Sequence, residues 1–147
     1  MRSDWVILAL HSADRAELSP VQVQKAIFLL GHELGETRGM SSALGPPYNF
    51  KPYHYGPYSP DLSTDLRSLA TEGVVDIRQG YYPNYSLTVK GQELGSKLAS
   101  AVGANTFDAI RGIVQWVRQR DFSQLVRDIY ERFPEQSVNS LFESRER

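Results

Sequence analysis

Two neighbouring stretches decide the fold, LRSLATEGVVDI at residues 66–77 and YSLTVKGQEL at residues 85–94. Leucines at helical spacing end at Gly73, after which the apolar residues change from the period of a helix to that of a strand. The strand-like apolar residues are Val74, Val75, Ile77, Tyr85, Leu87 and Val89. A polar turn around Gly80 separates the two runs, and Thr88 fits the N-cap of another helix. The sequence therefore predicts a helix, a β-hairpin and a second helix, in that order.

Further helices are predicted on the N-terminal side of this hairpin. Residues 5–10 are apolar on every side, which favours a short helix in the interior. Ser19 and Gln22 match a capping box, which opens a second helix. Ser59 followed by Pro60 opens the helix that carries the leucines.

Residues 36–58 are rich in glycine, proline and tyrosine. Solvated linkers seldom carry so many aromatic residues, so we expect a structured insertion, either a long loop or an edge strand. Within it, residues 50–55 fit one short strand, which Pro52 confines to an edge.

The C-terminal region, residues 105–147, repeats the helical pattern and is expected to pack on residues 1–104 within a single domain. Its large apolar residues include Trp116, Phe122, Tyr130, Phe133 and Phe142. Two interpretations stay open, because this bulk fits burial against the body of the protein and also fits a homodimer interface.

The composition excludes several classes of protein. The chain has 147 residues and no cysteine, which excludes thiolate metal sites and cysteine nucleophiles. Sixteen basic and seventeen acidic residues leave a net charge of −1, unlike that of a strongly basic nucleic-acid-binding protein. The apolar runs are too short for a membrane span or a signal peptide. A soluble, cytoplasmic protein with no membrane contact is expected.

The order of helix, helix, helix, hairpin and helix resembles that of a winged-helix domain. The predicted fold class is therefore mostly α with a small β-hairpin (α+β), with a winged-helix-like core and C-terminal helices. A narrower pattern joins Val23, Gln24, Lys25 and Phe28 in the second helix to Tyr55, Gly56, Pro57 and Pro60 in the turn. This pattern resembles the prokaryotic SocA-like antitoxin domains, also called Panacea, and the related YwgA-like proteins. The resemblance implies a non-enzymatic module that binds a partner protein and acts near toxin control or phage defence.

An acidic stripe runs along the predicted helix that begins after Ser59. Asp61, Asp65 and Glu72 fall on its outward face, opposite the leucines. From residue 56 to residue 76 Arg67 is the one basic residue, so the local charge is negative. Such a face repels phosphates. It is either a docking face for a partner protein or a solvated helix face.

The segment YHYGPY at residues 53–58 is the most unusual local feature. Tyrosine combines an apolar ring with a polar tip, so Tyr53, Tyr55 and Tyr58, together with His54, are candidates for contacting a partner. The alternative is a rigid turn whose rings pack over the second helix, and both interpretations can hold together.

The alternative function is that of a DNA-binding transcriptional regulator, which would grip phosphates through Arg67, Arg78 and Lys90. Enzymatic function is not expected. His32 and Glu33 begin like a zinc-protease helix, but Glu36 stands where the second histidine is needed. No phosphate-binding loop or nucleophile elbow is present. We therefore predict no catalytic residue, no metal ligand and no cofactor.

The sequence thus favours a protein-interaction module over a DNA-binding protein. Such a module would act as an antitoxin or as a defence-associated regulator. The predicted partner-binding residues are Tyr53, His54, Tyr55, Tyr58, Asp61, Asp65 and Glu72.

Overall fold

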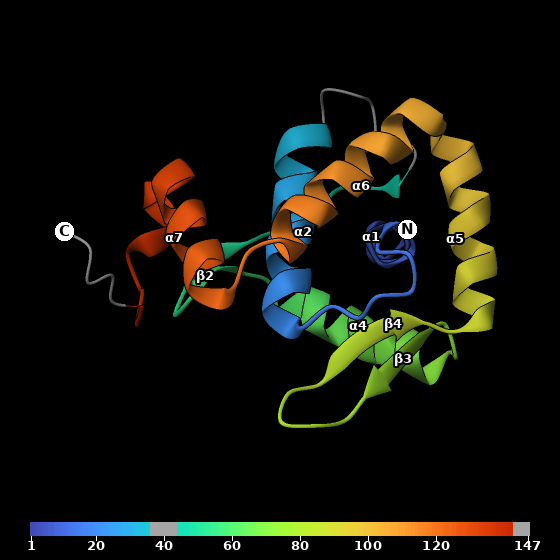
Figure 1. Cartoon of the computed structure of the whole chain (residues 1–147), viewed down its shortest axis with the longest axis horizontal. Coiled ribbons are helices and arrows are strands. Elements are labelled where there is room, and N and C mark those ends of the chain that lie inside the picture. Colours follow the sequence, from blue (N-terminus) through green and yellow to red (C-terminus); the bar gives the residue numbers. More distant parts are fainter. Residues whose placement is uncertain (36–43, 143–147) are drawn as a thin grey trace.

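The computed structural model describes residues 1–35 and 44–142. Its helices are α1 (Asp4–Ser12), α2 (Pro20–Leu34), α4 (Pro60–Thr71), α5 (Val89–Val102), α6 (Ala104–Arg118) and α7 (Phe122–Arg132), followed by a short 3-10 helix, η1 (Pro134–Ser137). Its strands are β1 (Lys51–Tyr53), β2 (Gly56–Tyr58), β3 (Val75–Arg78) and β4 (Asn84–Leu87), which form two antiparallel hairpins. The predicted α+β class, mostly helical, is confirmed (Figure 1). Among the described residues, no helix has the length and apolar character needed to cross a membrane.

Helix α1 lies at the centre of the molecule, seen end-on in Figure 1. Residues 5–10 are each at most 4% exposed, and α2, α5 and α6 pack around them. These residues leave the helix without a polar face, so only burial on every side removes their apolar surface from water. The predicted interior helix is confirmed.

Capping side chains fix where the helices begin. The Ser19 hydroxyl accepts a hydrogen bond from the Gln22 amide (3.2 Å), and the Gln22 side chain accepts one from the Ser19 amide (2.9 Å). This completes the predicted capping box of α2. Ser59 and Thr88 cap α4 and α5 by accepting from the amides three residues further on.

The β3–β4 hairpin follows α4 as predicted, after a turn at Gly73, whose φ is +77°. Its register pairs Val75 with Leu87 and Ile77 with Tyr85. Tyr85 also exchanges two backbone hydrogen bonds with Leu18, at 2.9 and 2.8 Å. This bridge attaches the hairpin to the segment between α1 and α2.

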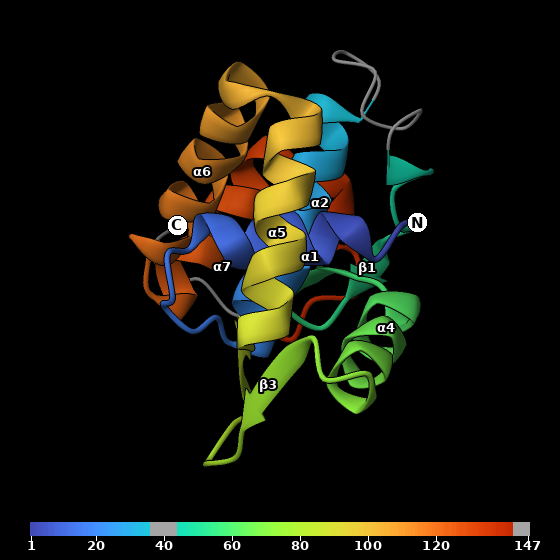
Figure 2. The same cartoon turned by 90° about the vertical axis from the view of Figure 1, so that its right-hand side faces the viewer.

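Helix α5 approaches its neighbours most closely through glycines. Its apolar residues Leu94, Leu98 and Val102 are partly buried and pack against the core. Gly91 and Gly95 are buried, and a β-carbon on Gly91 would lie 2.2 Å from the Val74 carbonyl oxygen. Figure 2 shows α5 crossing in front of α1. Val89, predicted as the last strand residue, begins α5 because Thr88 caps the helix, and its side chain is 79% exposed.

The insertion contains the predicted short strand within residues 50–55 as β1, but this strand belongs to a second hairpin that the sequence did not predict. Strand β1 pairs with β2, and the chain turns between them at His54 and Tyr55. Gly56 makes the turn possible, because its φ of +103° is one that residues with a side chain rarely adopt. Residues 36–43 of the insertion and 143–147 of the C-terminal extension lie outside the described residues.

Helices α6 and α7 share one hydrophobic core with the body of the protein. Helix α6 packs against α1 and α2, while α7 lies beside β2 and η1 (Figure 1). Their buried apolar residues include Ile110, Val114, Val117, Leu125 and Ile129. Phe133 is also buried, whereas the Phe122 side chain is 44% exposed. Burial against the body therefore accounts for much of the apolar bulk of this region, and Phe122 is an exception.

We predict that Gly91→Ala lowers the free energy of unfolding by about 1–3 kcal/mol, because the added methyl group overlaps the Val74 carbonyl oxygen. Gly112→Ala in α6 is the matched control. An added β-carbon there meets no atom within 4 Å, so alanine should stabilise the helix by about 0.5–1 kcal/mol. Urea unfolding measures both changes. Effects of the same sign would contradict the close packing of α5.

Candidate partner-binding site

Two adjacent polar residues of α2 attach the β1–β2 hairpin to the body of the protein. The Gln24 side chain donates to the Ser59 carbonyl (3.0 Å) and to the Ser63 hydroxyl (3.2 Å), and it accepts from the Ser59 amide (2.9 Å). The Lys25 ammonium donates to the Pro57 carbonyl (3.1 Å). Gln24 is 6% exposed and Lys25 is 3% exposed. These bonds fix the end of β2 and the start of α4 relative to α2.

A pocket of about 160 Å³ opens between this hairpin and helices α2 and α4. Four tyrosines line it, namely Tyr53, Tyr55, Tyr58 and Tyr85. Val21 and Leu66 add apolar surface, and Gln24 and Lys25 are its buried polar residues. The structure thus gathers three of the predicted partner-binding residues around one cavity.

Lys25 is a buried cation. Burial disfavours the charged form and lowers the pKa of its ammonium to about 8. Within residues 1–35 and 44–142 no carboxylate forms an ion pair with it, and the Pro57 carbonyl accepts one of its three N–H donors. The pocket therefore holds a positive charge that lacks a counter-charge in the described part of the chain.

The hairpin and the C-terminal region share an aromatic cluster, called here the aromatic ridge, made of Tyr53, His54, Tyr55, Phe122 and Phe142. His54 and Phe142 are partly buried, and the other three are exposed. Tyr53 stacks on His54 with ring centroids 4.1 Å apart, and Tyr55 meets Phe122 edge-on at 5.2 Å. Phe122 in turn lies 6.3 Å from Phe142. The side chains of Tyr53, Tyr55 and Phe122 are 51%, 41% and 44% exposed. Aromatic surface from two distant parts of the chain is thereby joined.

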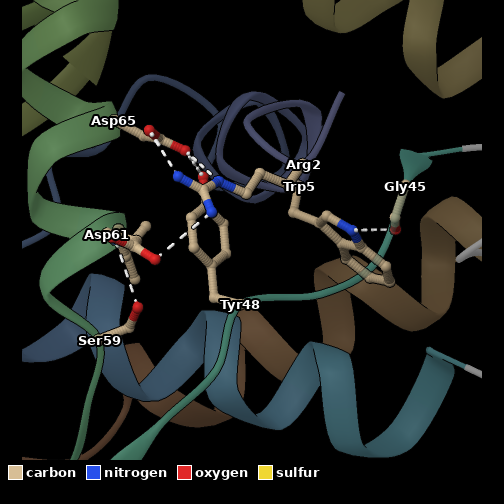
Figure 3. A network of polar contacts seen from close by, with 8 residues as sticks. Arg2, Trp5, Gly45, Tyr48, Ser59, Asp61 and Asp65 are labelled. Atoms are coloured by element: carbon tan, nitrogen blue, oxygen red, sulfur yellow. Dashed lines mark hydrogen bonds and ion pairs between the residues drawn. The ribbon is translucent and has the colours of Figure 1, made fainter.

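The acidic face of α4 is only partly available, which corrects the prediction of one outward surface. Figure 3 shows Arg2 reaching this face from the N-terminal segment: its Nε lies 2.9 Å from Asp65 and its Nη1 3.5 Å from Asp61. The Tyr48 hydroxyl also donates to Asp65, at 2.6 Å. The side chain of Asp65 is 19% exposed, against 65% for Asp61. Glu72 is exposed at the C-cap of α4, about 16 Å from Asp61 along the axis.

These contacts set the charge states in the network. Burial by itself would raise the pKa of the Asp65 carboxyl, but the hydrogen bonds from Arg2 and Tyr48 outweigh it and hold that pKa below its usual range. Burial and the bond to Asp65 raise the pKa of the Tyr48 phenol far above its ordinary value. Asp65 is thus an ionised group that the chain itself neutralises.

The residues predicted for DNA binding are engaged with the protein. Arg78 Nε lies 2.8 Å from both carboxylate oxygens of Glu17, and this hydrogen bond lowers the pKa of Glu17. The Lys90 ammonium donates to the backbone carbonyl of Glu72 (3.0 Å). Arg67 donates to a threonine hydroxyl one turn earlier in α4 (3.4 Å). Of the three, Arg78 has the firmest intramolecular partner.

Gln24, Lys25 and Phe122 were not among the site residues that the sequence predicted. One feature of the sequence points to a place for Lys25 at this packed face of α2. It lies four residues after Val21 and three before Phe28, within an apolar strip. The contact between Phe122 and Tyr55 joins residues far apart in the chain, and no local pattern indicates it. Among the described residues, no group of three or more His, Asp or Glu side chains is placed to hold a metal ion.

Comparison with family models, with curated proteins and with solved structures found no match for this chain. The resemblance to SocA-like and YwgA-like proteins therefore stays a prediction.

We predict that Asp65→Asn lowers the free energy of unfolding by about 1–3 kcal/mol at neutral pH, because the carboxylate binds two donors. Asp61→Asn, the matched control, should change it by less than about 0.5 kcal/mol because its ion pair is exposed. The folded-state pKa of Asp65 is lowered, so its contribution is present above the unfolded-state pKa and is lost as the pH falls through the folded-state value.

Chemical denaturation of the wild type and both variants, at neutral and at acidic pH, measures these differences. Equal losses for the two substitutions, or a loss at Asp65 that persists in strong acid, would contradict the role given to Arg2 and Tyr48.

Proposed function

We propose that this chain is a non-enzymatic, winged-helix-like protein-interaction module of the cytoplasm, which acts by binding a partner protein as an antitoxin or a defence-associated regulator does. One observation carries the proposal, namely the aromatic ridge and the tyrosine-lined pocket that adjoins it. Exposed apolar patches of this kind mark interaction surfaces, and tyrosine is enriched among the residues that dominate binding energy.

The ridge is also held rigidly, which favours binding. The hairpin is fixed to α2 by the buried bonds of Gln24 and Lys25, and Tyr55 is packed against Phe122. A surface that is ordered before it meets a partner loses less conformational entropy on binding. Aromatic side chains add large contact area with few rotatable bonds.

We therefore divide the predicted partner-binding residues into those that we propose to contact the partner and those that we do not. Tyr53, His54, Tyr55 and Tyr58 belong to the hairpin and form the centre of the proposed surface. Asp61 lies in the first turn of α4, close to the hairpin, and its side chain is mostly exposed, so we assign it to the polar rim. Asp65 is held by Arg2, and Glu72 lies at the far end of α4. We propose no partner contact for these two.

The order of α1, α2, α4, the β3–β4 hairpin and α5 supports the winged-helix-like part of the proposal. The antitoxin-like part is supported by the way the two halves of the sequence motif meet. Lys25 of the helix half donates to the carbonyl of Pro57 in the turn half, and Gly56 leaves room for this contact. The motif is therefore one spatial unit built around the pocket.

Affinity capture from cells of the native host tests the proposal with the variants Tyr55→Ser and Phe122→Ser. Val89→Ser is the matched control, because Val89 is an exposed apolar residue on α5. We expect one protein to be captured by the wild type and the control, and to bind the purified ridge variants about five- to thirtyfold more weakly, since each removes about 1–2 kcal/mol of contact. A partner that binds all four proteins equally would overturn the proposal.

The DNA-binding alternative stays a prediction, and no contact among the described residues favours it. Our proposal predicts that no DNA fragment from the native locus is retarded at low salt. A true interface would show a slope of log affinity against log salt of about −0.9 for each phosphate neutralised. A shift that weakens in Arg78→Gln and Lys90→Gln would favour DNA binding over the module proposed here.

A further inference from the structure

We propose that the pocket beside the β1–β2 hairpin is a carboxylate-binding site, and that its occupant is one acidic side chain of the partner protein, paired with Lys25 between tyrosine rings. The identity of the occupant rests on the proposed function. The existence of a carboxylate site rests on the pocket alone.

Lys25 carries a buried charge without a counter-charge among the described residues. Several arginines of the chain have intramolecular counter-charges, as Arg2 has Asp65, Arg78 has Glu17 and Arg120 has Asp128. Lys25 is more deeply buried than these arginines, yet the described residues offer it a single carbonyl and no carboxylate. A buried ammonium without a counter-ion is costly, and an anion bound beside it removes that cost.

The Lys25 ammonium lies beside Gly56, a residue of the hairpin that lines the pocket. Lys25 lines the cavity, and a β-carbon on Gly56 would lie 3.3 Å from its Cε and 3.7 Å from its Nζ. The glycine therefore lets the lysine lie directly against the turn of the hairpin. Donation to the Pro57 carbonyl uses one N–H, so two donors can serve a ligand oxygen.

The size and walls of the pocket define the class of ligand. About 160 Å³ has room for several water molecules, and therefore for one side chain rather than for a nucleotide or another large metabolite. A single lysine matches a single negative charge. The remaining walls are largely aromatic and apolar, which suits the methylene groups of an aspartate or glutamate and leaves a doubly charged phosphate poorly compensated.

The pocket is continuous with the aromatic ridge. Tyr53 and Tyr55 belong to the ridge and also line the pocket. A partner segment that lies on these rings is therefore within one side chain of Lys25. Apolar contact on the ridge and one buried ion pair in the pocket would then act together, with the ion pair selecting an acidic residue at one position.

Sodium propionate is the probe, because it is the side chain of glutamate without its backbone. Propionamide is the matched neutral ligand, and inorganic phosphate tests for a more highly charged anion. Binding is followed by NMR shifts of the amides of Tyr55 and Gly56 in the full chain. The variants are Lys25→Met and the matched control Lys90→Met, whose lysine is on the surface and also donates to a carbonyl oxygen.

We expect saturable propionate binding to the wild type and to Lys90→Met, with a Kd on the order of 10 mM for so small a ligand. Lys25→Met should bind at least tenfold more weakly, and so should propionamide on the wild type. The comparison of the two ligands needs no variant, so it holds even if Lys25→Met fails to fold. Equal binding of propionate and propionamide, no saturable binding, or tighter binding of phosphate than of propionate would overturn the inference.

The same reagents separate this inference from the proposed function. If a captured partner depends on Tyr55 and Phe122 but propionate does not bind, the carboxylate site is wrong and the interaction module stands. If propionate binds as expected but no partner depends on the ridge, the carboxylate site stands and the partner as its occupant is wrong. The carboxylate site and the partner as its occupant are both supported if substitution of one acidic residue of the partner weakens its binding to the wild-type chain but not to Lys25→Met.

Discussion

The buried polar pair Gln24 and Lys25 on α2 is the constraint on which the rest of the site depends. Gln24 supplies the hydrogen bonds that hold Ser59, the N-cap of α4, and Lys25 holds the carbonyl of Pro57, the middle residue of β2. Burying these groups is favourable only when their bonds are made, so the hairpin has one low-energy position. The tyrosines that line the pocket and form the ridge take their places from that position.

The distribution of charge supports the same view of function. Asp65 was predicted to contact a partner protein and Arg78 to contact DNA, but the charged groups of both are paired within the chain. Their partners, Arg2 and Glu17, are about 60 residues away in sequence, so these pairs also tie distant segments together. The surface left for recognition is therefore mainly aromatic, with one buried cation beside it. Such a surface selects for shape and for one acidic group more than for overall charge.

The sequence predicted interactions between residues that are close in the chain and missed those between residues that are far apart. The caps at Ser19, Ser59 and Thr88 were predicted correctly because each depends on residues within three positions. The acidic face of α4 was misjudged because Arg2 is 63 positions from Asp65, and helical periodicity carries no information about such a partner. The second hairpin was missed because β1 and β2 have three residues each, too few for a strand pattern. Lys25 was recognised as part of a motif, but its burial became evident only from the packed structure.

The most direct test is the pKa of Lys25, measured by NMR titration of lysine labelled at Cε, with Lys25→Met to assign the signal. A pKa of about 8 without a carboxylate ligand is predicted, because the ammonium is buried without a counter-charge. The unfolded chain then binds more protons than the folded one between pH 8 and 10.5, so stability rises with pH across that window. A pKa at the ordinary value of 10.5 would mean that the ammonium is solvated or already paired, and would contradict the account of the pocket.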